Sequence, residues 1–150
     1  MEIRYVRKLL MFVGVLFFNL SLMAYGESGV DEISIITDSS VPRPSMPMSE
    51  VTNIILGYKI QWPDKQPVVL VVCKEESLLQ KIAVVFAQKT PSQFMMYWKR
   101  KVFTGEGKFP MLVNTEQNVM EYVKSTPGAL GFIFSKTKPL EGIQVIKVSN

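Results

Sequence analysis

Short apolar runs alternate with amphipathic stretches over most of the chain. Residues 32–37 and 129–134 are mainly apolar and too short for ordinary helices, so both predict strands. Residues 67–72 form a β-branched run without alternation, which is typical of a strand buried on both faces, as in parallel sheets. Residues 142–148 alternate between apolar and polar side chains and predict a half-exposed strand, and residues 111–113 predict a brief one.

Four stretches between these strands carry apolar residues at helical spacing. Their predicted inner faces are Val51, Ile54 and Ile55; Leu78, Leu79, Ile82, Val85 and Phe86; Phe94, Met95 and Trp98; and Val119, Tyr122 and Val123. Ser49, Ser77 and Thr115 are predicted N-caps. Thr90-Pro91 predicts a helix start, because proline suits the first helical position. The order of these elements predicts an α/β fold, a mostly parallel sheet with helices on both faces.

Prolines and glycines mark the connections. Pro127 and Gly128 predict that the last helix ends in a tight turn leading directly into the strand at 129–134. Gly131 inside that strand leaves room for another backbone or a ligand. Residues 38–48 contain three prolines, which exclude helix and disfavour sheet, so this segment is expected to be irregular. Residues 102–110 are expected to form a glycine-broken loop.

The N-terminus has the organisation of a secretory signal peptide. Arg4, Arg7 and Lys8 precede an apolar segment of about 14 residues, and small residues stand at Ala24 and Gly26. An uncleaved membrane anchor is the alternative, but the apolar segment is shorter than the roughly 20 residues of a spanning helix. We therefore expect residues 1–26 to be a signal peptide cleaved after Gly26, and residues 27–150 to form a single periplasmic domain.

Composition narrows the function. Three cations and one carboxylate among the first eight residues account for +2 of the formal net charge of +4, so the remainder is nearly neutral and nucleic acid is not an expected partner. The chain has no histidine, which removes Ser-His and Cys-His pairs and the commonest zinc ligand. Cys73, the single cysteine, excludes an intramolecular disulfide, and at the end of an apolar run it is expected to be buried rather than reactive. We expect no enzyme, no catalytic residue, no metal and no cofactor.

The remaining candidate chemistry is binding. In open α/β sheets, ligands lie beyond the carboxyl ends of the strands, where helix N-termini favour anions. Two loops fit this description: one carries Ser39 and Ser40, and the other carries Lys74 and Ser77. We expect the two loops to meet, so that their hydroxyl and N–H groups can hold a small oxyanion. Alternatively, Ser39 and Ser40 are simple turn residues and Ser77 is a simple helix cap.

Several motifs together resemble the phosphate-binding proteins of bacterial ABC transporters. Asn53-Ile-Ile-Leu-Gly-Tyr-Lys59 followed by Trp62-Pro-Asp64 is similar to that family's "IFLGK…W-D" segment. Asn114-Thr-Glu116 and Thr126-Pro-Gly-Ala-Leu-Gly-Phe132 resemble its "N-E-x…T-P-G-A-I-G-Y" segment. The segment from Tyr97-Trp98 to Gly105 resembles short stand-alone relatives described as phosphate-transporter substrate-binding-like proteins. The resemblance covers roughly residues 33–134.

The resemblance implies a type II periplasmic-binding-protein fold, here truncated because full-length members are about twice as long. It also implies capture of phosphate or a similar oxyanion and a possible ABC transporter permease partner. The stretch from Pro67 to Ser77 resembles the family's strand and ligand loop, in which an Arg and a Ser-Gly-Thr group hold the phosphate. Here that loop reads Cys73-Lys-Glu-Glu-Ser77, so only Ser77 matches and two carboxylates are added. Each close carboxylate opposes a phosphate by about 1 kcal/mol or more. The alternative function is a ligand-free descendant of this fold that serves as an interaction or sensory partner of another envelope protein.

Overall fold

A computed structural model describes residues 32–149 of the chain, so the expected signal peptide and its cleavage site lie outside the described residues. The elements are β1 (Ile33–Asp38), β2 (Ser45–Pro47), α2 (Met48–Ile55), β3 (Val69–Cys73), α3 (Glu76–Ala87), α4 (Pro91–Phe103), β4 (Met111–Val113), α5 (Glu116–Ser125), β5 (Ala129–Phe134) and β6 (Ile143–Ser149). Between residues 32 and 149, none of the helices has the length and apolar character needed to cross a membrane.

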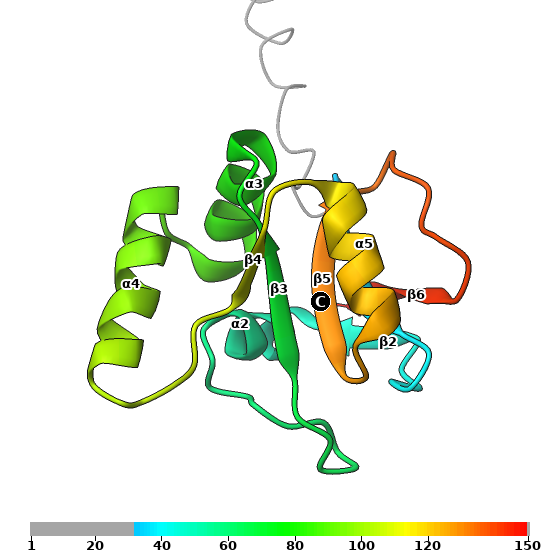
Figure 1. Cartoon of the computed structure of the whole chain (residues 1–150), viewed down its shortest axis with the longest axis horizontal. Helices are drawn as coiled ribbons and strands as arrows, with labels where there is room; N and C mark the ends of the chain where they lie inside the picture. The colour runs from blue at the N-terminus through cyan, green and yellow to red at the C-terminus, as the bar shows by residue number, and fades with distance from the viewer. Residues whose placement is uncertain (1–31, 150) are drawn as a thin grey trace, which may run out of the picture.

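The strands form one six-stranded sheet in the order β2-β6-β1-β5-β3-β4 (Figure 1). Three of its five pairings are parallel, namely β3 with β5, β3 with β4, and β2 with β6. β1 runs antiparallel to both of its neighbours, β5 and β6. The predicted α/β class with a mostly parallel sheet is therefore confirmed, and the antiparallel strand lies in the middle of the sheet.

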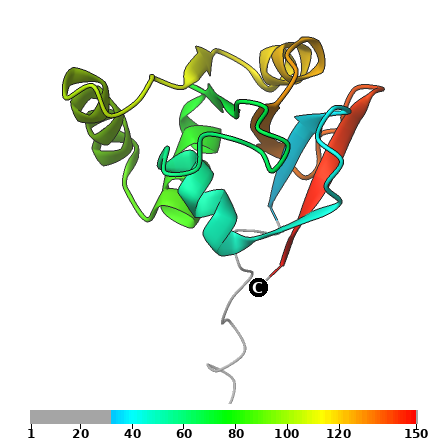
Figure 2. The same cartoon turned by 90° about the horizontal axis from the view of Figure 1, so that it is seen from below.

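Helices cover both faces of the sheet, as predicted. Successive residues of β5 point to opposite faces. A Cβ placed on Gly131 would lie 2.5 Å from a methyl carbon of Val119 in α5. The ring of the next residue, Phe132, lies 5.2 Å from that of Phe86 in α3. In Figure 2, α5 lies on one side of the sheet and α2 and α3 on the other, with α4 outermost. Gly131 thus allows α5 to pack directly against the strand.

The hydrophobic core is built from the faces that the sequence predicts. Val51, Ile54 and Ile55 are buried in α2, and Phe94 and Trp98 are buried in α4. β3 and β5 are almost completely buried, which explains their continuous apolar runs. β6 alternates in exposure around the buried Ile146, as its sequence predicts.

Three local predictions are wrong. The proline-rich segment 38–48 is not entirely irregular, because Ser45–Pro47 form β2 at the edge of the sheet, where prolines are tolerated. Ser49 and Ser77 are the second residues of α2 and α3 rather than their N-caps, and the N-cap residues are Pro47 and Glu75. α4 continues to Phe103, beyond the expected start of the loop.

The turn between α5 and β5 joins three parts of the chain. Gly128 has φ +76°, which favours glycine, and a Cβ there would lie 2.3 Å from the carbonyl oxygen of Pro67. Its N–H donates to Oδ1 of Asp38 at 2.9 Å. Its carbonyl accepts from the N–H of Val69 and from the indole N–H of Trp62, both at 3.0 Å. The predicted turn therefore fixes β1, β3 and β5 to one another.

Candidate functional site

Ser39 and Ser40 follow β1 and take part in the hydrogen bonds around the Gly128 turn. The N–H of Ser40 donates to Oδ2 of Asp38 at 2.9 Å, and its hydroxyl donates to Oε1 of Gln66 at 3.2 Å. The same hydroxyl accepts from the N–H of Gly128 at 3.3 Å. Both serines are exposed, and Asp38 is buried. These contacts make Ser40 a structural residue of the turn.

Lys74 and Ser77 lie at the carboxyl end of β3, where the chain enters α3. The N–H of Lys74 donates to the carbonyl of Val113 at 2.8 Å, which extends the pairing of β3 with β4. The hydroxyl of Ser77 donates to Oε1 of Glu75 at 2.9 Å. Both side chains are exposed. An incoming anion would meet the ammonium group of Lys74, and it would compete with Glu75 for the hydroxyl of Ser77.

The two loops do not converge, so that expectation is wrong. Thr37 of β1 and Leu70 of β3 lie level with each other, because both pair with Leu130 of β5. β1 runs antiparallel to β5 and β3 runs parallel to it, so from this level the two strands continue in opposite directions. Cys73 is three residues beyond Leu70, which is about 10 Å at the rise of a strand. Figure 1 shows the loop after β1 at the lower end of the sheet and the start of α3 at the upper end.

The N-terminus of α3 is the stronger anion candidate. Among the described residues no side chain caps α3, whereas the hydroxyls of Thr90 and Thr115 cap α4 and α5. The N–H groups of its first turn therefore lack a side-chain acceptor, and the positive end of the helix dipole there favours an anion. Lys74 adds a cation at the same place.

Carboxylates surround this helix start as well. Glu75 and Glu76 are exposed beside Lys74 and Ser77. Burial raises the pKa of the Cys73 thiol, and the negative charges of Glu75 and Glu116 raise it further, although the N–H of Glu75 donates to its sulfur. Cys73 is fully buried, as the sequence predicted. The upper end of the sheet therefore combines a favourable helix start with an unfavourable local charge.

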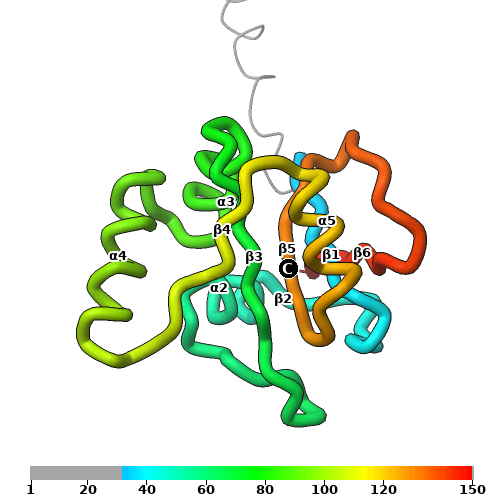
Figure 3. Tube along the Cα trace, in the orientation of Figure 1, coloured from blue at the N-terminus to red at the C-terminus, as the bar shows by residue number. Residues whose placement is uncertain are grey.

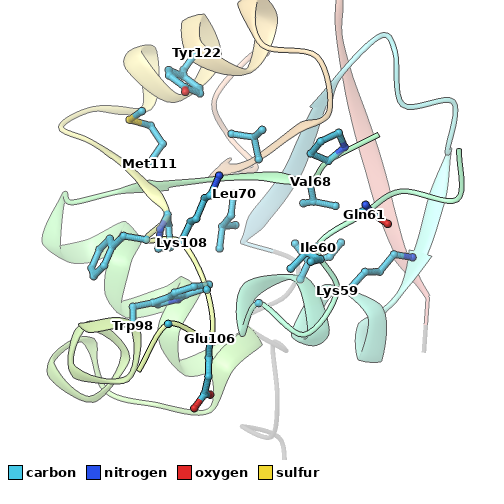
Figure 4. Close-up of a pocket in the computed structure, with 18 residues that line it drawn as sticks. Lys59, Ile60, Gln61, Val68, Leu70, Trp98, Glu106, Lys108, Met111 and Tyr122 are labelled. Atoms are coloured by element: carbon cyan, nitrogen blue, oxygen red, sulfur yellow. The ribbon is translucent and has the colours of Figure 1, made fainter. Parts of the chain in front are cut away.

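A cleft that was not expected from the sequence lies at the lower end of the sheet in the view of Figure 1, and Figure 4 shows it in close-up. Its volume is about 790 Å³. It is bounded by β3, the start of β4, residues 57–61 and residues 105–110, with Trp98 and Tyr122 contributed by α4 and α5. Figure 3 traces the connections α2–β3 and α4–β4 at the end of the sheet opposite to the start of α3. Ile60, an apolar residue in the connection between α2 and β3, was the sequence signal for it.

Comparison with solved structures shows the fold. The chain aligns with a putative phosphate ABC transporter substrate-binding protein with bound phosphate from Clostridium perfringens at 15% identity and a TM-score of 0.58, covering 78% of this chain and 44% of that chain. PstS from Borrelia burgdorferi aligns at 14% identity and a TM-score of 0.59, covering 79% and 47%. An ABC-type phosphate transport receptor from Vibrio cholerae aligns at 12% identity and a TM-score of 0.53, covering 78% and 46%.

No protein-family model and no curated protein matches the sequence. The chain spans less than half the length of the solved structures with which it aligns. The resemblance in the sequence motifs is thus confirmed for the fold, and the structural neighbours are binding proteins rather than enzymes. The chain has the fold of part of a phosphate ABC transporter substrate-binding protein.

Proposed function

We propose that this protein is a periplasmic binding module for phosphate or a similar small oxyanion, held at the N-terminus of α3. The observation that carries the proposal is the uncapped start of α3 beside Lys74 and Ser77, in a fold shared with phosphate-binding proteins. We further propose that residues 1–26 direct export and are removed after Gly26, and that an ABC transporter permease receives the ligand.

The groups at this site suit an oxyanion of modest charge. Free N–H groups of the first helical turn are directional donors, and Lys74 supplies a mobile positive charge. Glu75 and Glu76 oppose a dianion more strongly than a monoanion, because the Coulomb energy scales with ligand charge. The proposed module therefore discriminates among oxyanions by charge as well as by size.

Isothermal titration calorimetry of the mature chain with phosphate, sulfate and molybdate tests the proposal. We expect heat of binding with at least one of these anions, a weaker response in Lys74→Gln and Ser77→Ala, and a stronger one in Glu76→Gln. Lys99→Gln is the matched control for Lys74→Gln, because Lys99 is exposed on α4, away from α3's first turn. No heat with any anion at about 10 mM, well above the 1 mM that corresponds to −4.1 kcal/mol, would refute the proposal.

Ser39 and Ser40 remain predicted ligands, now at the other end of the sheet. Ser39→Ala separates the two locations, because Ser39 is exposed and donates no side-chain hydrogen bond within residues 32–149. If Ser39→Ala weakens anion binding while Ser77→Ala does not, the anion lies beside β1 instead of α3.

The alternative function is that of an envelope interaction or sensory protein that has lost its ligand. The carboxylates Glu75 and Glu76 favour this reading, because they stand where a phosphate would have to approach. Cross-linking in envelope extract distinguishes the two functions. A specific cross-linked partner, formed equally with and without phosphate and accompanied by a flat calorimetric titration, would support the alternative.

A further inference from the structure

The cleft at the lower end of the sheet, which we call the edge cleft, is lined mainly by apolar side chains. Those drawn from the sheet and its neighbours are Ile54, Ile60, Val68, Val69, Leu70, Trp98, Phe109, Pro110, Met111 and Tyr122. Its volume of about 790 Å³ lies within the range typical of small-molecule sites. Such a surface is costly to leave in water, which points to an apolar occupant.

The entrance to the edge cleft is apolar too. Ile60 is 66% exposed and Met111 is 40% exposed, although both line the cleft. Tyr58, which precedes Ile60 by two residues, is 65% exposed. An occupant with a long apolar body would cover the exposed parts of Ile60 and Met111 in addition to filling the interior.

Polar groups in the edge cleft are few, and the charged ones are Lys59, Glu106 and Lys108. Glu106 is exposed, and Figure 4 shows its carboxylate pointing away from Lys108 and Leu70. Lys59 forms an ion pair with Glu50, so its charge is already matched. Lys108 is exposed and forms no ion pair with any residue between 32 and 149. Figure 4 shows Lys108 between Trp98 and Leu70, in the middle of the apolar lining. Its ammonium group is therefore placed to meet an anionic group on a ligand whose body lies against these side chains.

We propose that the edge cleft binds a single-chain amphiphile, with an aliphatic body and one anionic head group that pairs with Lys108. The apolar lining favours an aliphatic body because binding removes apolar surface from water. The ammonium group of Lys108 favours a head group of negative charge. This site is distinct from the start of α3. The cleft is lined by Val68, Val69 and Leu70, whereas the anion site follows Cys73 at the far end of the same strand.

Titration with dodecanoate tests the proposal directly. We expect saturable binding of one dodecanoate per chain by calorimetry, below the concentration at which micelles form. Affinity should rise by about fourfold for each methylene from octanoate to dodecanoate, because each one removes further apolar surface from water. Dodecanol should bind more weakly than dodecanoate, since it has the same body without the charge.

Two pairs of variants locate the site. Lys108→Gln should weaken dodecanoate binding about fivefold and leave dodecanol unchanged, whereas Lys99→Gln, an exposed lysine on α4, should change neither. Ile60→Ser should weaken both ligands, whereas Val84→Ser, which removes a 53% exposed valine on α3, should weaken neither. All four positions are exposed, so the variants are expected to fold.

The two tryptophans provide an internal reporter. Both tryptophans are buried, but Trp98 lines the cleft, whereas Trp62 does not and donates its indole N–H to the carbonyl of Gly128. Dodecanoate should therefore change the fluorescence of Trp62→Phe and leave that of Trp98→Phe nearly unchanged. Affinity that is independent of chain length, or a Lys108→Gln variant that binds dodecanoate as tightly as the wild type does, would overturn the proposal. Neither result depends on whether phosphate binds at α3.

Discussion

Replacing Gly128 by alanine should destabilise the protein far more than replacing Gly105, although both glycines have φ +76°. The shared φ means that the intrinsic cost of holding alanine in the left-handed region is the same at both positions, about 1–2 kcal/mol. A Cβ on Gly105 would meet no atom within 4 Å, so that variant should show this cost alone. Gly105→Ala is therefore the matched control.

At Gly128 the new Cβ would lie 2.3 Å from the carbonyl oxygen of Pro67, which is backbone and cannot rotate away. The resulting shift disturbs the bonds from the Gly128 N–H to Asp38 and from Val69 and Trp62 to the Gly128 carbonyl. Buried hydrogen bonds contribute about 1 kcal/mol each, and more when one partner is charged. We expect a total loss of about 3–5 kcal/mol for Gly128→Ala.

Urea unfolding followed by tryptophan fluorescence measures both free energies by linear extrapolation. Because small domains have a stability of about 5–15 kcal/mol, Gly128→Ala should unfold at a much lower urea concentration while Gly105→Ala shifts the midpoint only slightly. If the two variants lose the same free energy of unfolding, the contact with Pro67 and the three hydrogen bonds do not contribute the additional stability expected of them.

Three further predictions concern single side chains. Thr90→Ala should lower the free energy of unfolding, measured in urea, by about 1 kcal/mol, because the Thr90 hydroxyl caps α4. Thr90→Ser keeps a capping hydroxyl and should therefore retain most of the wild-type stability. Burial acts to raise the pKa of Glu50, but hydrogen bonds and charge from Lys59 and Arg43 outweigh it and hold that pKa below its ordinary 4.5. The contribution of ionised Glu50 to the free energy of unfolding is complete above about pH 4.5, and it is lost as the pH falls through the lower pKa of the folded state. The difference in free energy of unfolding between wild type and Glu50→Gln should therefore shrink over that interval in acid titrations. Burial raises the pKa of the Cys73 thiol, so iodoacetamide at about pH 8 should label the native chain much more slowly than the urea-unfolded one, and equal rates would contradict its burial.

Elements with strong local signals were predictable from the sequence. Thr90-Pro91 begins a helix with a complete capping box, and Thr115 caps the next helix. Pro127-Gly128 ends that helix and leads into β5, as predicted. Each of these signals acts within about four residues, because capping and turn geometry are set by neighbouring backbone groups.

The directions and partners of strands were less predictable. β1 pairs with β5 and β6, which follow it by about 100 residues. An apolar strand buried on both faces presents the same pattern whichever way it runs, so its sequence does not specify parallel or antiparallel pairing. The predicted meeting of Ser39 with Ser77 depended on a parallel β1, and it is wrong for that reason. The edge cleft was missed for a related reason, since it is formed by side chains from five separate segments.

The antiparallel β1 also determines which end of the sheet offers a helix start to an anion. It brings Asp38 to the Gly128 turn, where its carboxylate is used in the structure rather than in binding. At the opposite end, α3 and α5 both begin just after parallel strands, but Thr115 occupies the first turn of α5. α3 alone of these two helices keeps its N–H groups uncapped. A helix start contributes about 0.3–2 kcal/mol toward an anion, which is comparable to the repulsion from one nearby carboxylate. Whether phosphate binds measurably therefore depends on the Coulomb attraction from Lys74 relative to the Coulomb repulsion from Glu76.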